Sequence, residues 1–184
     1  MSVGDLSTST QNYLKAIWGL KEWSSEPVTA TLIAKQLGLK LSSVSDAVRK
    51  MAKQGLVSHT PYGSVELTEL GRQYALVMVR RHRLLESFLV QALGYTWDEV
   101  HNEAENLEHA VSDMLIERVD KFLDYPTRDP HGDPIPTVDG QITIPSAHRL
   151  TDSGAQSQVT VERISDADPQ LLKFLEERGI VTGA

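Results

Sequence analysis

The strongest constraint on the fold is a pair of short helices separated by a tight turn. Apolar residues recur at helical spacing over residues 29–37, and Gly38 is suited to a left-handed helix C-terminus. Ser42 is predicted to cap the next helix, which runs to about Gln54. A helix, a short glycine-containing turn and a second helix form the helix-turn-helix pattern.

The residues around this pair predict a winged version of the motif. An earlier helix is predicted from Ser7 or Thr8 to about Trp23. Two β-like runs, 56–60 and 64–67, flank Pro61-Tyr62-Gly63 and predict a hairpin, the wing.

The remainder of the chain is predicted to be mainly helical and then irregular. One long helix is expected from Thr68 to about Leu93, and a second from Trp97 or Asp98 to about Leu123. Residues 125–155 are rich in Pro, Gly and Asp and predict an irregular connection. After it, residues 158–164 resemble a strand, and residues 168–178 resemble a helix that Gly179 closes.

Small polar and cationic side chains lie on the outward face of the predicted 42–54 helix. Such residues contact phosphates and base edges, so we expect DNA binding there; the alternative is a solvated face of a structural helix bundle. Asp46 could accept a hydrogen bond from a cytosine amino group, or could weaken nonspecific binding. The candidate DNA-binding residues, with one from the wing, are Ser42, Ser43, Ser45, Asp46, Arg49, Lys50, Lys53 and Tyr62.

Composition limits the other classes of protein. The chain has 184 residues, a net charge of −7 and no cysteine, which excludes disulfides and thiolate metal ligands. A small basic excess in residues 1–75 contrasts with an acidic excess in the rest. No apolar run approaches the roughly 20 residues that span a bilayer, and the start lacks the form of a signal peptide. We therefore expect a cytoplasmic protein that does not bind membranes.

Metal-ligand residue types gather in residues 101–109. On one continuous helix, His101, Glu105, Glu108 and His109 would lie within about 100° of arc. A divalent cation would relieve the repulsion between the two carboxylates; the alternative is a solvated acidic face. The i, i+4 pair His82 and Glu86 could join this cluster if the two long helices are antiparallel neighbours.

Three stretches together resemble the diphtheria toxin repressor family of iron- and manganese-dependent transcriptional regulators. They are residues 80–86, residues 101–109 and residues 132–136, and the likeness covers most of residues 6–140. The resemblance implies a mainly α fold with a winged helix-turn-helix, a helical dimerisation domain and a partial C-terminal SH3-like segment. The corresponding division is 1–73 for DNA binding, 74–140 for metal binding and dimerisation, 141–157 for a linker and 158–184 for the start of the SH3-like module.

The resemblance also implies two metal sites. The primary site would use Asn12, Glu105, Glu108 and His109, and the ancillary site His82, Glu86 and His101, with Asp166 as the best candidate ligand from the third module. Glu105 and Asn12 replace the Cys and Met of the iron-sensing branch. Hard oxygen ligands favour Mn²⁺, with Fe²⁺ as the alternative and Zn²⁺ or Co²⁺ as ions that bind in vitro.

The sequence therefore predicts a homodimeric repressor that binds a palindromic operator in double-stranded DNA when Mn²⁺ or Fe²⁺ occupies its sites, and that regulates metal homeostasis. Two rival hypotheses remain, a metal-independent winged-helix regulator and a metal-dependent hydrolase. The sequence contains no nucleophile motif and no separate general base, so we expect that the protein is not an enzyme.

Overall fold

The computed structural model describes residues 3–60 and 63–184 and is mainly helical. It divides into two compact units, one ending at Val79 and the other beginning at Arg80, which are described separately. None of the helices in the described residues is long and apolar enough to cross a membrane.

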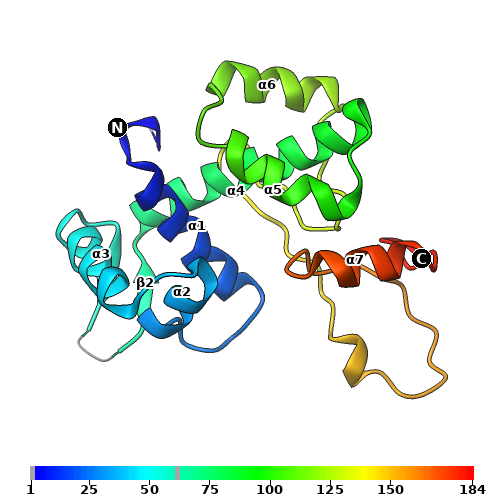
Figure 1. The fold of residues 1–184 in the computed structure, drawn as a ribbon, viewed down its shortest axis with the longest axis horizontal. Helices are drawn as coiled ribbons and strands as arrows, with labels where there is room; N and C mark the ends of the chain where they lie inside the picture. Colours follow the sequence, from blue (N-terminus) through cyan, green and yellow to red (C-terminus); the bar gives the residue numbers. More distant parts are fainter. Residues whose placement is uncertain (1–2, 61–62) are drawn as a thin grey trace. The chain divides into compact units, whose positions relative to one another are not determined.

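The first unit begins with a 3-10 turn and three α-helices (Figure 1). Helix α1 (Thr8–Glu22) has Ser7 as its N-cap, whose side chain accepts from the Thr10 amide, and Trp23 as its C-cap, as predicted. The 3-10 turn, η1 (Val3–Asp5), is held because the Gln11 side-chain amide donates to the Val3 carbonyl at 3.0 Å. The chain entering α1 is thereby fixed to the helix itself.

Helices α2 (Ala30–Leu37) and α3 (Leu41–Lys53) form the predicted helix-turn-helix. Gly38 ends α2 with φ 64°, a left-handed conformation that glycine adopts without steric cost. The predicted cap of α3 is wrong: Lys40 is the N-cap, and Ser42 lies inside the helix. The turn between α2 and α3 is shorter than a cap at Ser42 would make it, because the helix already begins at Leu41.

The wing follows as an antiparallel pair, β1 (Val57–His59) and β2 (Val65–Leu67), with Val57 opposite Leu67. The buried face of α3 completes an apolar core with this pair and with α1 and α2. Its fully buried members include Leu14, Ile17, Ile33, Val44, Val48, Met51 and Val65. Tyr62, the candidate DNA-binding residue predicted for the wing, lies outside the described residues.

Helix α4 (Glu69–Leu93) starts in close contact with the strand region. The Thr68 hydroxyl donates to the Gly55 carbonyl at 2.7 Å. A Cβ at Gly71 would lie 1.9 Å from the Leu56 carbonyl oxygen, so only glycine permits this approach. Gly94 ends the helix with φ 74°, close to the predicted end at Leu93.

The second predicted long helix is wrong, because the chain forms two helices there. Helix α5 (Trp97–Leu107) ends at the C-cap Glu108, and α6 (Asp113–Phe122) starts at the N-cap Ser112, whose side chain accepts from the Leu115 amide. His109 therefore lies in the intervening turn. The apolar core of this unit contains Leu84, Leu85, Leu89, Val100, Ala104, Ile116, Val119 and Ile135.

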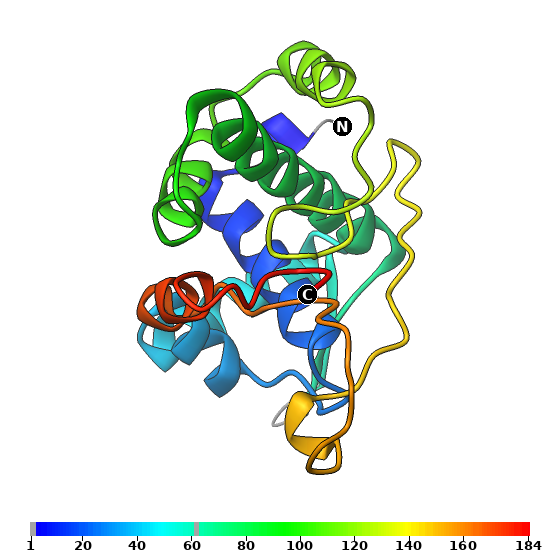
Figure 2. The same cartoon turned by 90° about the vertical axis from the view of Figure 1, so that its right-hand side faces the viewer.

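The connection after α6 is irregular, as predicted, and contains the short η2 (Leu150–Asp152); Figure 2 shows its long path before the C-terminal helix. Helix α7 (Pro169–Glu176), capped by Asp168, packs against α5. Residues 158–164 have no regular secondary structure, so the predicted strand there is wrong. The backbone hydrogen bonds of this stretch have partners in different segments. Val161 bonds to the last residues of the chain, and the Ile164 amide donates to the His131 carbonyl at 2.9 Å.

Candidate metal centre and DNA-binding face

Three arginines of α4 hold separate segments of the second unit around the candidate ligands. Arg80 donates to the Pro136 carbonyl at 2.7 Å and pairs with Asp120. Arg81 donates to the Glu108 carbonyl at 3.3 Å and pairs with Asp113 at 2.6 Å. Both guanidinium groups are largely buried, so they fix the backbone at these points instead of moving in solvent.

Arg83 is the third of these arginines and reaches the 129–134 loop. It donates to the Pro134 carbonyl at 2.6 Å and lies 3.7 Å from an Asp129 carboxylate oxygen and 3.5 Å from one of Asp133. Asp133 also pairs with Arg163 of the C-terminal segment. A Cβ at Gly132 would lie 2.1 Å from the Glu162 carbonyl oxygen, so the loop and the C-terminal segment are tightly packed.

The predicted ancillary residues converge. His82, Glu86, His101 and Asp166 each offer a ligand atom, and these atoms all lie within 4.8 Å of one another. His82 Nε2 is 3.0 Å from Glu86 Oε1, and His101 Nδ1 is 2.9 Å from Asp166 Oδ2. Two imidazoles and two carboxylates from α4, α5 and the C-terminal segment thus form a compact set of hard and borderline donors, which suits a divalent first-row metal.

The charges in this cluster depend strongly on one another. Burial alone would raise the pKa of Glu86, but His82, His101 and His131 around it hold the pKa below its usual value. Burial opposes charging of His101 as well, yet its bonds to Asp166 and Glu86 raise its pKa to about 10. Since a metal binds the unprotonated imidazole, ligation at this cluster releases a proton.

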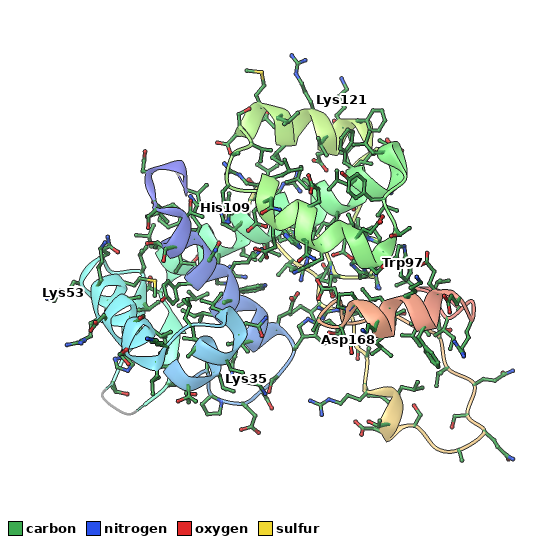
Figure 3. The ribbon with its side chains drawn as sticks, in the orientation of Figure 1. Lys35, Lys53, Trp97, His109, Lys121 and Asp168 are labelled. Carbon is green, nitrogen blue, oxygen red and sulfur yellow. The ribbon has the colours of Figure 1, made fainter. Side chains whose placement is uncertain are left out.

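The second predicted cluster lies at the end of α5. Glu108 is fully buried, its Oε2 is 2.6 Å from His82 Nδ1, and its Oε1 is 3.5 Å from His109 Nε2. Glu105, Glu108 and His82 also offer ligand atoms within 4.8 Å of one another. The helix break brings Glu108 and His109 together through a C-cap and a turn, whereas the sequence predicted one continuous helix face. Figure 3 labels Trp97 at the start of α5 and His109 just after its end.

A third group, formed by Glu86, Asp129 and His131, was missed by the sequence analysis. His131 Nε2 lies 3.3 Å from the Trp97 carbonyl, which can only accept, so Nε2 carries a proton. His131 Nδ1 and Asp129 Oδ2 are buried without a hydrogen-bond partner in the described part of the chain. The Asp-Pro-His spacing in the 129–131 segment was the available signal.

Asn12 lies in α1, in the first unit, apart in sequence from the other predicted primary ligands. Its Oδ1 is buried and has no hydrogen-bond partner among the described residues. Burying an amide oxygen without a hydrogen-bond partner costs free energy, and coordination of a cation by this oxygen would offset that cost.

The outward face of α3 carries the predicted DNA-binding side chains. Ser42, Ser43, Asp46, Arg49, Lys50 and Lys53 are exposed, whereas Ser45 is half-buried and donates to the Leu41 carbonyl at 2.9 Å. Asp46 pairs with Arg49 on this face. Figure 3 shows Lys53 at the outer side of α3.

Comparison with known proteins agrees with both halves of this description. Residues 5–65 match the family model described as the iron dependent repressor, N-terminal DNA binding domain, and residues 68–137 match its metal binding and dimerisation domain. This chain belongs to the iron-dependent repressor family. The fold expected from the sequence, a winged helix-turn-helix followed by a helical dimerisation domain, is confirmed.

Individual members of the family are similar over most of the chain. The iron-dependent repressor IdeR of Mycobacterium leprae is 34% identical over 194 residues, covering 99% of this chain and 84% of its own. The diphtheria toxin repressor of Corynebacterium efficiens is 39% identical, over 72% of this chain and 57% of its own. A solved manganese-dependent transcriptional repressor in complex with manganese is 53% identical, with a TM-score of 0.90 over 95% of this chain and 80% of that one.

Proposed function

We propose that this member of the iron-dependent repressor family is a manganese-activated transcriptional repressor that binds operator DNA as a dimer and regulates metal homeostasis. The observation that carries the proposal is the convergence of buried His82 and Glu86 with half-buried His101 and Asp166 in a chain that also contains a winged helix. Buried carboxylates and imidazoles at this density are expensive unless they are paired or bind a metal.

The residues fit a divalent metal in two places. The ancillary site would be held by His82, Glu86, His101 and Asp166, and Asp129 and His131 lie beside Glu86 as further donors. The primary site would be held by Glu105, Glu108 and His109 with Asn12. When bound, the metal supplies positive charge that offsets the buried carboxylates and links donors from separate segments.

The donor set favours Mn²⁺, with Fe²⁺ as the alternative. The chain has no cysteine, and the proposed ligand atoms are carboxylate and amide oxygens and imidazole nitrogens. Oxygen-rich sites suit Mn²⁺, although Zn²⁺ and Co²⁺ bind nitrogen and oxygen donors more tightly in vitro. Similar repressors support Mn²⁺ and Zn²⁺ within this range, since one solved structure contains manganese and another, of ScaR, contains Zn²⁺.

Operator contact is proposed for the outward face of α3 and for the wing. Arg49, Lys50 and Lys53 would contact phosphates, and Ser42, Ser43, Ser45 and Asp46 lie toward the start of the helix, where recognition helices meet base edges. A primary metal bound by Asn12 and the α5 ligands would fix α1, and with it the placement of α3. This is the proposed route from metal to DNA.

The dimer interface is proposed on α6. Met114, Leu115 and Phe122 are 64%, 45% and 66% exposed, a large apolar surface for one short helix. An interface between two copies would cover it, and a two-fold dimer reads a palindromic operator with half-sites about one helical turn apart or a multiple. Sedimentation should therefore show a dimer without metal, and a metal-free monomer at micromolar concentration would contradict this assignment.

We infer that the protein is not an enzyme, because the donors are directed at one another in the interior and the family is one of repressors. The domain division at residues 73, 140 and 157, with the start of an SH3-like module at 158–184, remains part of the proposal.

The test is operator binding during a Mn²⁺ titration. An operator selected from random DNA in the presence of Mn²⁺ should bind about 5- to 150-fold more weakly after chelation, the usual range for coupled ligands. Equal binding with and without chelator would favour a metal-independent regulator. Hydrolysis of phosphoester or peptide substrates by the metal-loaded protein would favour the hydrolase alternative.

A further inference from the structure

We propose that His82 couples the two metal sites, because one of its ring nitrogens holds Glu108 of the primary site while the other faces the ancillary donors. The inference rests on the proposed function, since it concerns how the metal sites regulate each other. It makes His82 a positioning residue for the primary site in addition to a ligand of the ancillary one.

The geometry places His82 between two carboxylates. Its Nδ1 is 2.6 Å from Glu108 Oε2, and its Nε2 is 3.0 Å from Glu86 Oε1. His82, Glu86 and Glu108 are 7%, 1% and 0% exposed, so water does not compete for these contacts. His82 belongs both to the group with Glu86, His101 and Asp166 and to the group with Glu105 and Glu108.

The two nitrogens have different tasks. In the metal-free protein both nitrogens lie beside a carboxylate, Nδ1 beside Glu108 and Nε2 beside Glu86. A metal that took the lone pair of Nε2 would leave the ring proton on Nδ1, which then donates to Glu108. Nε2 lies 3.3 Å from His101 Nδ1 and faces the ancillary donors, so it is the nitrogen available as a ligand there. Ligation at Nε2 therefore leaves the Nδ1–H bond to Glu108 in place and fixes the tautomer that makes this bond.

Fixing His82 in this way orients Glu108. The Glu108 backbone is already held, because Arg81 donates to its carbonyl oxygen at 3.3 Å. The bond from His82 then fixes one carboxylate oxygen, and the other oxygen faces His109. A carboxylate oriented by an outer hydrogen bond is a better ligand, and loss of such a bond typically lowers metal affinity by about 10- to 100-fold. The ancillary metal should therefore raise the affinity of the primary site.

The test is a double-mutant cycle on Mn²⁺ binding by the full-length protein, followed by calorimetry and by the EPR signal of free Mn²⁺, without DNA. His101→Gln removes an ancillary ligand that does not contact Glu108. His82→Gln keeps an oxygen near the position of Nε2 and removes the donor at Nδ1. Glu108→Gln identifies which binding step belongs to the primary site, and Asp166→Asn repeats the ancillary deletion from a different segment.

We expect His101→Gln and Asp166→Asn each to weaken the primary site about 5-fold or more, although neither side chain belongs to it. In the His82→Gln protein, the added His101→Gln change should leave the primary site unaffected. The control is His148→Gln, a histidine outside all of the candidate ligand groups.

Two results would overturn the coupling. One is an unchanged primary affinity after both ancillary deletions. The other is additivity of the His82→Gln and His101→Gln effects, which would mean that the sites communicate by another route. If His82→Gln does not fold, the two ancillary deletions alone still decide whether the sites are coupled. Two independent Mn²⁺ sites would leave the proposed function intact, whereas absence of Mn²⁺ binding to the parent protein would overturn both.

Discussion

The two units of this protein have opposite interiors. The described part of the first unit buries apolar side chains, with Gln11 as its buried polar residue, and keeps its charged groups out of the core, those on the outside of α3 among them. The second unit buries nine ionisable side chains. These are Arg81, His82, Arg83, Glu86, Glu108, Asp120, Asp129, His131 and Asp133. In the first unit the proposed DNA-binding side chains are exposed and contribute little to the stability of the fold. In the second unit the proposed metal ligands are in the interior, so the stability of the fold depends on how their charges are compensated.

The largest effect should come from removing a compensating charge in the second unit. Arg83→Ala would leave Asp129 and Asp133 buried with one cation fewer, and removing one member of a buried ion pair costs about 3–5 kcal/mol. Burial with Glu86 and Asp133 as neighbours already raises the pKa of Asp129. Denaturant unfolding without metal measures the loss, with exposed Arg118→Ala as the control.

A comparable but purely apolar loss is expected in the first unit. Leu14 is fully buried, and Leu14→Ala should cost about 2–5 kcal/mol through lost burial and the cavity left behind. Since the site is apolar, the cost should be similar at pH 6 and pH 8. A strongly pH-dependent cost would show that the contrast between the two interiors is wrong.

A smaller effect on free energy, larger for function than for folding, is expected from Glu108→Gln. The change keeps the shape but removes a charge and a strong ligand, so Mn²⁺-dependent operator binding should fall by about 5- to 150-fold, or about 1–3 kcal/mol. Glu103→Gln, on the same helix but outside the candidate ligand groups, should change little. His82→Ala at the ancillary site should reduce activation only in part.

The smallest effect is expected on the surface of the first unit. Lys53→Ala should weaken binding to specific and random DNA alike and lower the salt slope by about one unit. Lys35→Ala, an exposed lysine of α2 that Figure 3 also labels, is the matched control. An unchanged slope for Lys53→Ala would remove this residue from the DNA-binding face.

Local sequence signals predicted the first unit well. Ser7 caps the start of α1 as expected, and Trp23 and Gly38 lie at the ends of α1 and α2. The apolar spacing in α3 matches its buried face of Val44, Val48 and Met51. Each of these depends on neighbours in the chain. The exception is the start of α3, where Lys40 is the N-cap and no side-chain cap hydrogen bond forms.

The second unit depends more on contacts between distant residues. Periodicity did not reveal the break after Leu107, because Ser112 followed by Asp113 looks ordinary inside a longer helical pattern. Nor did it reveal the group formed by Glu86, Asp129 and His131, which requires the 129–134 loop to fold back on α4. Spacing supplied the His82 and Glu86 pair and, for antiparallel helices, its approach to His101, and the family resemblance supplied their assignment to an ancillary site.

If the bound metal raises the affinity for operator, bound operator must raise the affinity for the metal by the same factor, and this reciprocal effect can be measured. Mn²⁺ affinity is measured by calorimetry in the presence and absence of saturating operator. Operator should tighten Mn²⁺ binding by the same factor by which Mn²⁺ tightens operator binding, about 5- to 150-fold. Mn²⁺ affinity that is identical with and without operator would contradict this coupling.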